Sequence, residues 1–207
     1  MRRNLSRGIE RDIIVVGASA GGVEVLQTLA STLPADIPAT LFMVMHFPSW
    51  ARSELPHLLL RSGPLPAVHP QSGERFEHGK IYVAPPDRHM LLEEGKVVLW
   101  RGPKENRYRP SVNALFRSAA VSYGPRVTGV ILTGALDDGS AGLWWVRRHG
   151  GFGLVQDPAE ALFPDMPLNA LQYVDSAYTA RVEEMGGLLY SLAKGEEFEA
   201  CNQQKRA

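Results

Sequence analysis

The sequence predicts a single-domain α/β fold: a doubly wound, mostly parallel sheet with helices on both faces and an antiparallel hairpin insert. Short apolar, β-branched runs alternate with longer segments of helical period, which is typical of parallel α/β proteins. The early runs each end at a turn that contains glycine or proline. The chain has 207 residues, 44% of them hydrophobic, which is enough for one sizeable core.

The first strand and helix surround a glycine-rich turn. Residues 13–16 (IIVV) predict a buried strand, and the turn GASAGG follows it. Apolar residues then recur at helical spacing over residues 26–33, until Pro34 ends the helix. Further strands are expected over residues 40–45 (TLFMVM), 127–132 and 153–156. Further helices are expected over residues 111–123 and 142–149, and Ser111 is the expected N-cap of the first of these two.

The middle of the chain has a different pattern. Three strand-like runs occupy residues 80–84, 89–92 and 97–100, and the segments PPDR and EEGK separate them. Short turn-forming segments of this kind are typical of the loops in β-hairpins. We therefore expect an antiparallel hairpin insert here and no further βαβ unit.

Composition also predicts the domain boundaries. Residues 1–11 form an N-terminal extension, residues 12–195 form the folded domain, and the polar residues 196–207 form a C-terminal tail. No internal repeat or low-complexity linker divides the folded part.

Charge and cysteine content exclude several function classes. The 22 Lys and Arg residues are balanced by 22 Asp and Glu, so there is no basic excess for neutralising a nucleic-acid backbone. The single cysteine, Cys201, excludes an internal disulfide and a thiolate metal cluster. No apolar run approaches the roughly 18 residues that span a bilayer, and no secretory leader is evident. We expect a cytoplasmic protein with no nucleic-acid partner, no membrane insertion and no metal.

Three predicted strand ends each carry a reactive residue type. Ser19 lies in GASAGG, His46 closes the second strand, and Asp138, with Asp137 beside it, follows a later strand. Ligands bind beyond the carboxyl ends of parallel strands, so these turns are expected to meet at one edge. Serine, histidine and a carboxylate are the set that acyl transfer requires. The N–H of Ala20, at a helix start, is the first candidate donor to an oxyanion.

Two alternatives remain on the pattern alone. A glycine-rich strand-to-helix turn also binds phosphate in nucleotide-binding folds, although the spacing here is not G-x-G-x-x-G. The turn does satisfy G-x-S-x-G, but the chain order Ser, His, Asp differs from the order in α/β-hydrolases. The second alternative is a non-catalytic module that keeps the fold and docks on a receptor.

The sequence resembles the catalytic domain of the chemotaxis methylesterase family CheB. The matching segments are VVGASAGGVE, FMVMHFP, GKIYVAPPDRHMLLE, RPSVNALFRSAA, YGPRVTGVILTGALDDGSAGL and QDPAEALFPDMPLNAL. The resemblance implies that residues 12–195 are a methylesterase catalytic domain that needs no cofactor. Its implied substrates are glutamate γ-methyl esters on the cytoplasmic helices of methylated chemoreceptors (methyl-accepting chemotaxis proteins), with methanol as a product. Deamidation of receptor glutamines is a second implied reaction.

The resemblance also implies roles for individual residues. Ser19 is the expected nucleophile, His46 the base and Asp138 the carboxylate that orients it. Some family members have methionine where this chain has Ala135, in a segment expected to shape the oxyanion site, so Ala135 is the second oxyanion candidate. The best-known members carry a receiver domain ahead of the catalytic domain. Here the first strand begins near Asp12, so the sequence resembles a stand-alone branch.

Other polar residues near these segments are expected to be solvated. His89 is expected to face solvent. Arg88, Arg107 and Arg109 are candidates for attracting acidic receptor helices, although scattered arginines are usually solvated surface.

Overall fold

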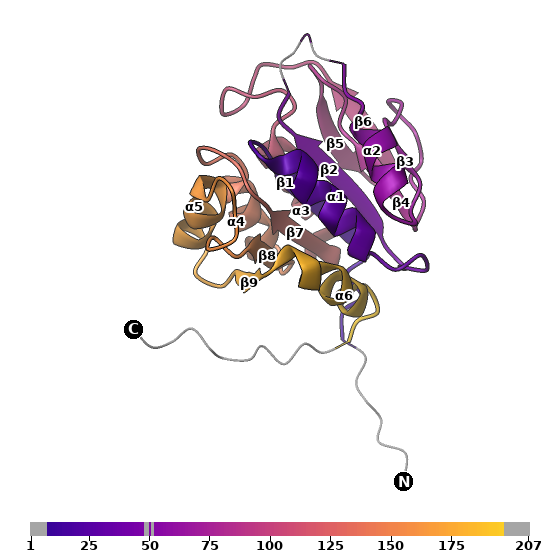
Figure 1. Ribbon diagram of the computed structural model, residues 1–207. Helices are drawn as coiled ribbons and strands as arrows, with labels where there is room; N and C mark the ends of the chain where they lie inside the picture. The colour runs from indigo at the N-terminus through magenta and orange to yellow at the C-terminus, as the bar shows by residue number, and fades with distance from the viewer. Residues whose placement is uncertain (1–7, 48–49, 51, 197–207) are drawn as a thin grey trace, which may run out of the picture.

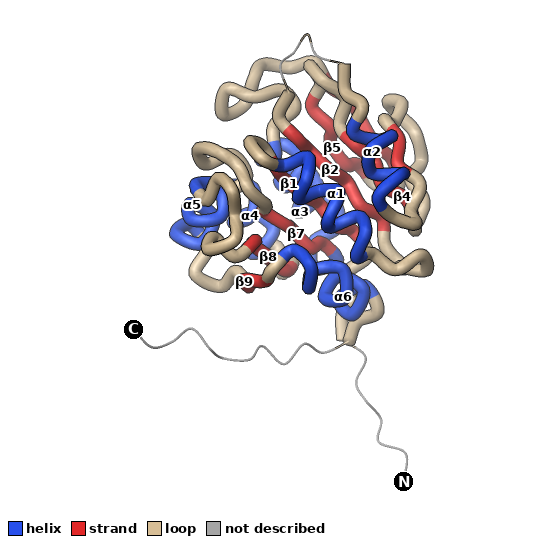
Figure 2. The backbone as a smooth tube through the Cα atoms, in the orientation of Figure 1, coloured by secondary structure: helices blue, strands red, loops and turns tan. Residues whose placement is uncertain are grey.

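The main sheet is entirely parallel. The computed structural model describes residues 8–47, 50 and 52–196, and Figure 1 and Figure 2 show how its helices flank the strands. Seven strands run in the order β3-β4-β2-β1-β7-β8-β9, and each neighbouring pair is parallel. These strands are β1 (Ile13–Ala18), β2 (Thr40–Met45), β3 (Ala67–Val68), β4 (Lys80–Val83), β7 (Val127–Ile131), β8 (Phe152–Gln156) and β9 (Tyr178–Ala180).

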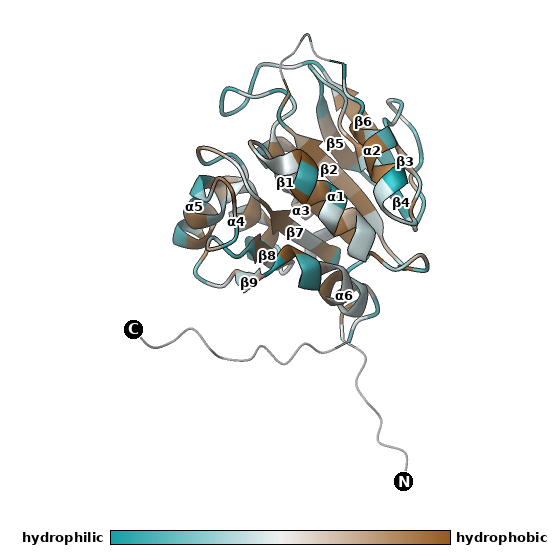
Figure 3. Cartoon of the chain, viewed as in Figure 1, coloured by the Kyte–Doolittle hydropathy of each residue, from teal (hydrophilic) through white to brown (hydrophobic). Residues whose placement is uncertain are grey.

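Helices cover both faces of the sheet, which confirms the predicted doubly wound fold. One face packs against α1, α2 and α6, and the other packs against α3, α4, α5 and an antiparallel hairpin of β5 and β6. Figure 3 shows mainly apolar strands flanked by helices in which apolar and polar residues are mixed. The remaining bounds are α1 (Gly22–Thr32), α2 (Leu55–Ser62), β5 (His89–Glu93), β6 (Lys96–Trp100), α3 (Val112–Tyr123), η1 (Gly124–Arg126), α4 (Ser140–Arg148), α5 (Asp165–Tyr173) and α6 (Val182–Ala193).

Strand β1 divides its side chains between two cores. Ile14 and Val16 face the side of α1 and α6, whereas Ile13 and Val15 face the side of α3 and α4. All four are fully buried. A strand buried on both faces has no polar alternation, which explains why the sequence here is a continuous apolar run. Burial of each such side chain contributes about 1.5–3 kcal/mol.

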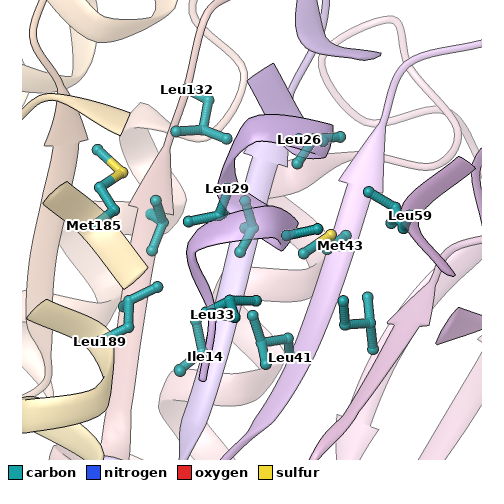
Figure 4. Close-up of a cluster of buried hydrophobic side chains, with 14 of the residues drawn as sticks. Ile14, Leu26, Leu29, Leu33, Leu41, Met43, Leu59, Leu132, Met185 and Leu189 are labelled. Atoms are coloured by element: carbon teal, nitrogen blue, oxygen red, sulfur yellow. The ribbon is translucent and has the colours of Figure 1, made fainter. Parts of the chain in front are cut away.

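The core under α1 and α6 brings those two helices close together. Figure 4 shows Leu29 of α1 and Met185 and Leu189 of α6 packed over the strands. Near Met185, an added Cβ at Gly186 would lie only 2.2 Å from the carbonyl oxygen of Thr32, at the end of α1. Glycine is therefore required at position 186 for this close approach.

The prediction for residues 80–84 is wrong. This segment is β4, which pairs in parallel with β2 inside the main sheet and does not belong to the hairpin insert. Its residues 81–83 are buried, and α2 makes the crossover between β2 and this side of the sheet. Only the strands predicted over residues 89–92 and 97–100 form the hairpin.

Several other elements differ from the predictions at their ends or were not predicted. The helix expected over residues 142–149 begins two residues earlier, at Ser140. Elements α2, β3, α5, β9 and α6 have no counterpart among the predictions. Most of the predicted polar tail, including Cys201, lies outside the described residues. Across the described ranges, no helix is long and apolar enough to cross a membrane.

Two adjacent glycines of α6 provide a test of the α1–α6 contact. We expect Gly186→Ala to destabilise the protein by about 1–3 kcal/mol, because the new methyl group meets backbone that cannot move aside. An added Cβ at Gly187 has nothing within 4 Å, so Gly187→Ala, at an exposed position of α6, should stabilise the protein by up to about 1 kcal/mol. Thermal unfolding followed by circular dichroism measures both changes. Equal Tm shifts in the two variants would contradict the close approach.

Candidate active site

The turns that carry Ser19, His46 and Asp138 lie side by side. Strand β1 lies between β2 and β7, so the turns after these three strands open on the same carboxyl edge of the sheet. Ser19 directly follows β1 and His46 directly follows β2, whereas Asp138 follows β7 after a short loop. The structure thus brings together the three residues that the sequence singled out, and their chemical roles stay predictions.

The three side chains form one hydrogen-bonded line. His46 Nδ1 lies 3.1 Å from Ser19 Oγ, and His46 Nε2 lies 2.8 Å from Asp138 Oδ2. Because an ionised carboxylate only accepts, Nε2 carries the proton and Nδ1 is left to accept the Ser19 hydroxyl. The line is almost sealed from solvent, since Ser19 is 8% exposed and the side chains of His46 and Asp138 are 6% and 0% exposed.

Asp138 accepts hydrogen bonds from the start of helix α3 as well as from His46. The Val112 N–H donates to Oδ2 at 2.8 Å, the Asn113 N–H donates to Oδ1 at 3.2 Å, and the Ser111 hydroxyl donates to Oδ1 at 2.9 Å. Ser111 occupies the N-cap position, but its side chain makes no cap hydrogen bond. The expectation that Ser111 caps this helix is therefore wrong: the Asp138 carboxylate fills that role, where the helix dipole favours negative charge.

Asn113 makes the reverse contact, from α3 to the start of α4. Its side-chain oxygen accepts the N–H of Gly139 at 3.0 Å and of Gly142 at 2.7 Å. Gly139 has a φ of +103°, and an added Cβ would lie 2.5 Å from the side chain of Ile131. Each helix start is thus satisfied by a side chain from the other segment, which holds Asp138 in place.

Asp137, the rival carboxylate, lies elsewhere. It is exposed, and its Oδ1 accepts a hydrogen bond of 3.1 Å from the side-chain amide of Asn106. Among the described residues it makes no hydrogen bond with His46.

The two oxyanion candidates differ in position. Ala20 lines the cleft beside Ser19, and its N–H donates no hydrogen bond to any residue that the structure describes. Ala135 is half-buried in the loop after β7 and does not line that cleft. The backbone of Gly134 comes close to Ser19, because an added Cβ at Gly134 would lie 2.8 Å from Ser19 Cβ. Both assignments stay predictions.

Tyr108 is a site residue that the sequence analysis missed. Its ring stacks on His46 with centroids 3.6 Å apart and planes within 1°. Hydrogen bonds constrain the two nitrogens of the imidazole, and Tyr108 constrains its face. A single tyrosine in a polar loop has no periodicity that could reveal such a contact, and its place just before the RPSVN segment is the nearest available signal.

The loop over residues 101–110 carries Tyr108 and forms one side of the cleft. The Arg109 side chain anchors this loop, since its Nε donates to Asp87 Oδ1 at 2.9 Å and its Nη1 donates to the Gly102 carbonyl at 2.6 Å. The guanidinium of Arg109 holds the pKa of the Asp87 carboxyl below its usual range. The cleft has a volume of about 510 Å³, and its lining includes Ser19, Ala20, His46, Lys104, Arg107 and Tyr108.

His89 is buried, so the expectation that it faces solvent is wrong. It is 1% exposed; its Nε2–H donates to the Pro103 carbonyl at 2.9 Å, and its Nδ1 accepts the Ser111 N–H at 3.3 Å. Burial is tolerated because both ring nitrogens have backbone partners. His89 thereby ties the loop over residues 101–110 to the start of α3.

A doubly wound α/β domain with serine, histidine and aspartate aligned at its carboxyl edge has the architecture of a serine hydrolase. The family model of the CheB methylesterases matches residues 14–189. The chain belongs to the CheB methylesterase family and is an enzyme of the hydrolase class.

Named relatives and a solved structure agree with this assignment. A Leptospira interrogans protein called "putative protein-glutamate methylesterase/protein-glutamine glutaminase" is 33% identical over 182 residues, which cover 87% of this chain and 94% of that protein. A Photorhabdus laumondii protein-glutamate methylesterase/protein-glutamine glutaminase is 38% identical over 164 residues, 77% of this chain and 47% of that one. The crystal structure of the Thermotoga maritima CheB methylesterase catalytic domain matches with a TM-score of 0.82 and 29% identity, over 89% of this chain and 100% of that chain.

The hydrogen bonds of Asp138 predict a stability difference between the two neighbouring aspartates. We expect Asp138→Asn to lower the free energy of unfolding by about 1–3 kcal/mol, because an amide nitrogen replaces one acceptor oxygen in a buried site full of donors. Asp137→Asn should change it by no more than about 0.5 kcal/mol, because that side chain is exposed. Denaturant titration at neutral pH compares the two. A larger loss in Asp137→Asn would contradict the described network.

Proposed function

We propose that this chain is a protein-glutamate methylesterase that hydrolyses glutamate γ-methyl esters on the cytoplasmic helices of chemoreceptors. The observation that carries the proposal is the hydrogen-bonded line of Ser19, His46 and Asp138 beside an open cleft. Family membership and the names of the relatives support the substrate class. In this proposal residues 12–195 are the catalytic domain, and the protein acts in the cytoplasm without a cofactor.

The first half of the reaction forms an acyl-enzyme. His46 Nδ1 accepts the proton of the Ser19 hydroxyl as the oxygen attacks the γ-carbonyl carbon of the ester. Asp138 accepts the Nε2–H, keeps that nitrogen protonated, and stabilises the imidazolium that forms. The tetrahedral intermediate collapses when the imidazolium protonates the methoxy oxygen, so methanol leaves and the glutamyl group stays on Ser19.

The second half repeats these steps with water. His46 Nδ1 takes a proton from water, the hydroxide adds to the acyl carbon, and Ser19 leaves with the proton returned by His46. In both halves the oxyanion accepts hydrogen bonds from backbone N–H groups, with Ala20 as the first donor and the Ala135 segment as the second. The unused N–H of Ala20 supports its assignment. Loss of one such donor typically costs about 10²–10³ in kcat.

A second reaction, deamidation of glutamine, follows the same route with ammonia as the leaving group. The relatives' names include protein-glutamine glutaminase activity, which favours this second reaction. An amide carbonyl is less electrophilic than an ester carbonyl, and its nitrogen cannot leave until His46 has protonated it, so we place the amide second to the ester.

The nucleophile assignment has a direct test. We expect Ser19→Ala to abolish methanol release from a peptide that carries one glutamate γ-methyl ester, while the Tm stays close to that of the wild type. Ser140→Ala is the matched control, since it removes a buried hydroxyl that has no hydrogen-bond partner among the described residues. Near-normal turnover in Ser19→Ala would remove this serine from the mechanism.

The carboxylate assignment is tested with the two neighbouring aspartates. Asp138→Asn should reduce kcat by about 10⁴, the loss seen when the carboxylate of a triad becomes an amide and the imidazole takes the wrong tautomer. Asp137→Asn should keep kcat within a few-fold, because its side chain contacts Asn106 and not His46. Steady-state kinetics on the same peptide ester compares them. The reverse order of losses would transfer the role to Asp137.

A further inference from the structure

Two cations at the rim of the cleft have no ionic partner. Lys104 and Arg107 line the same cleft as Ser19 and His46, and both are exposed. Within the part of the chain that the structure describes, neither makes an ion pair or a side-chain hydrogen bond. Their neighbours Arg101 and Arg109 differ, because both bind Asp87.

The acids around this loop are already engaged. Asp87 is shared by two arginines, Glu105 pairs with Arg117 at 2.6 Å, and Asp137 accepts from the Asn106 amide at 3.1 Å. The fold therefore uses its nearby carboxylates to anchor the loop and leaves Lys104 and Arg107 without one.

The backbone at Arg107 adopts a conformation that is unfavourable for a residue with a side chain. Glu105 and Tyr108 exchange backbone hydrogen bonds of 3.1 and 2.9 Å, and the two residues between them, Asn106 and Arg107, have φ values of +52° and +73°. Two positive φ angles inside such a pair define a type I′ turn, whose preferred sequence is Asn-Gly. Asparagine stands where expected, but arginine occupies the position where glycine is favoured, and a Cβ is strained there.

A residue in a strained backbone conformation, whose side chain makes no hydrogen bond or ion pair with the described residues, points to a function outside the fold. Residues held in unfavourable backbone regions cluster at ligand-binding sites. Arg107 is exposed and makes no ion pair with any residue that the structure describes, so its side chain is free to contact what enters the cleft. A planar guanidinium matches a carboxylate with two parallel hydrogen bonds.

We propose that Arg107, assisted by Lys104, is a specificity-determining residue that binds a carboxylate side chain of the substrate next to the scissile ester. This inference rests on the proposed function, because it assigns the chemistry of the residues that flank the methylated glutamate. Substrates with acidic neighbours are then preferred over neutral ones, and the preference weakens with ionic strength because the contact is exposed.

The test uses two synthetic peptides that each carry one glutamate γ-methyl ester, flanked by glutamates in one and by glutamines in the other. For the wild type we expect kcat/KM to be about tenfold higher for the acidic peptide, mainly through KM. Arg107→Gly should remove most of this preference, leaving the part that Lys104 contributes, while keeping a Tm equal to or above that of the wild type, because glycine relieves the turn. Arg107→Lys should retain part of the ratio, and Arg148→Gln, which removes a surface charge at the far end of α4, should retain all of it.

Two outcomes would overturn the inference: an equal kcat/KM for both peptides in the wild type, or a ratio that Arg107→Gly leaves intact. Peptide binding to the Ser19→Ala variant, measured by fluorescence anisotropy, gives the same comparison without turnover. If the wild type releases methanol from both peptides at equal rates, the specificity inference fails and the esterase proposal stands. If neither peptide ester is hydrolysed, the esterase proposal fails, and equal binding of the two peptides then overturns the specificity inference independently.

Discussion

The site depends on one buried carboxylate. Asp138 is completely buried, and an ion without solvent is stable only when hydrogen bonds replace its hydration. Four donors do so, three from residues 111–113 at the start of α3 and one from His46. The position of the imidazole is therefore set by the packing of α3 against the start of α4. The return contact from Asn113 to Gly139 and Gly142 makes this packing reciprocal.

The imidazole is constrained on several sides before any substrate binds. Ser19 and Asp138 orient its two nitrogens, and Tyr108 stacks on its face. An imidazole held in this way would need little reorganisation in the proposed proton transfer, which is the property that preorganised sites exploit. The ring orientation also fits the order of the strands in the sheet: His46 follows β2 on one side of β1, and Asp138 lies in the loop after β7 on the other side.

Patterns that arise from burial were predictable from the sequence, and contacts between loops were not. The strand over residues 40–45 was predicted at its observed ends, because both its faces are buried and the apolar run is continuous. The sequence also predicted that the turns with Ser19 and His46 lie close together, because the carboxyl ends of parallel strands lie at the same edge of the sheet. Residues 80–84 were assigned to the hairpin because a turn-forming segment, PPDR, follows them. The crossover helix α2, which places them in the main sheet, is short and was not predicted. Tyr108 lies in a loop, where no period of 2 or 3.6 marks a buried face.

The loop over residues 101–110 joins two tasks that are usually separate. Tyr108 stacks on His46, while the adjacent Arg107 lines the cleft from the same tight turn. Ion pairs of Glu105 with Arg117 and of Arg109 with Asp87 anchor the turn on both sides of Arg107 and Tyr108. In the proposed enzyme, a substrate carboxylate bound at Arg107 would therefore also hold the turn that stacks Tyr108 on His46. In that case, recognition of the flanking residues and positioning of His46 both depend on the same turn.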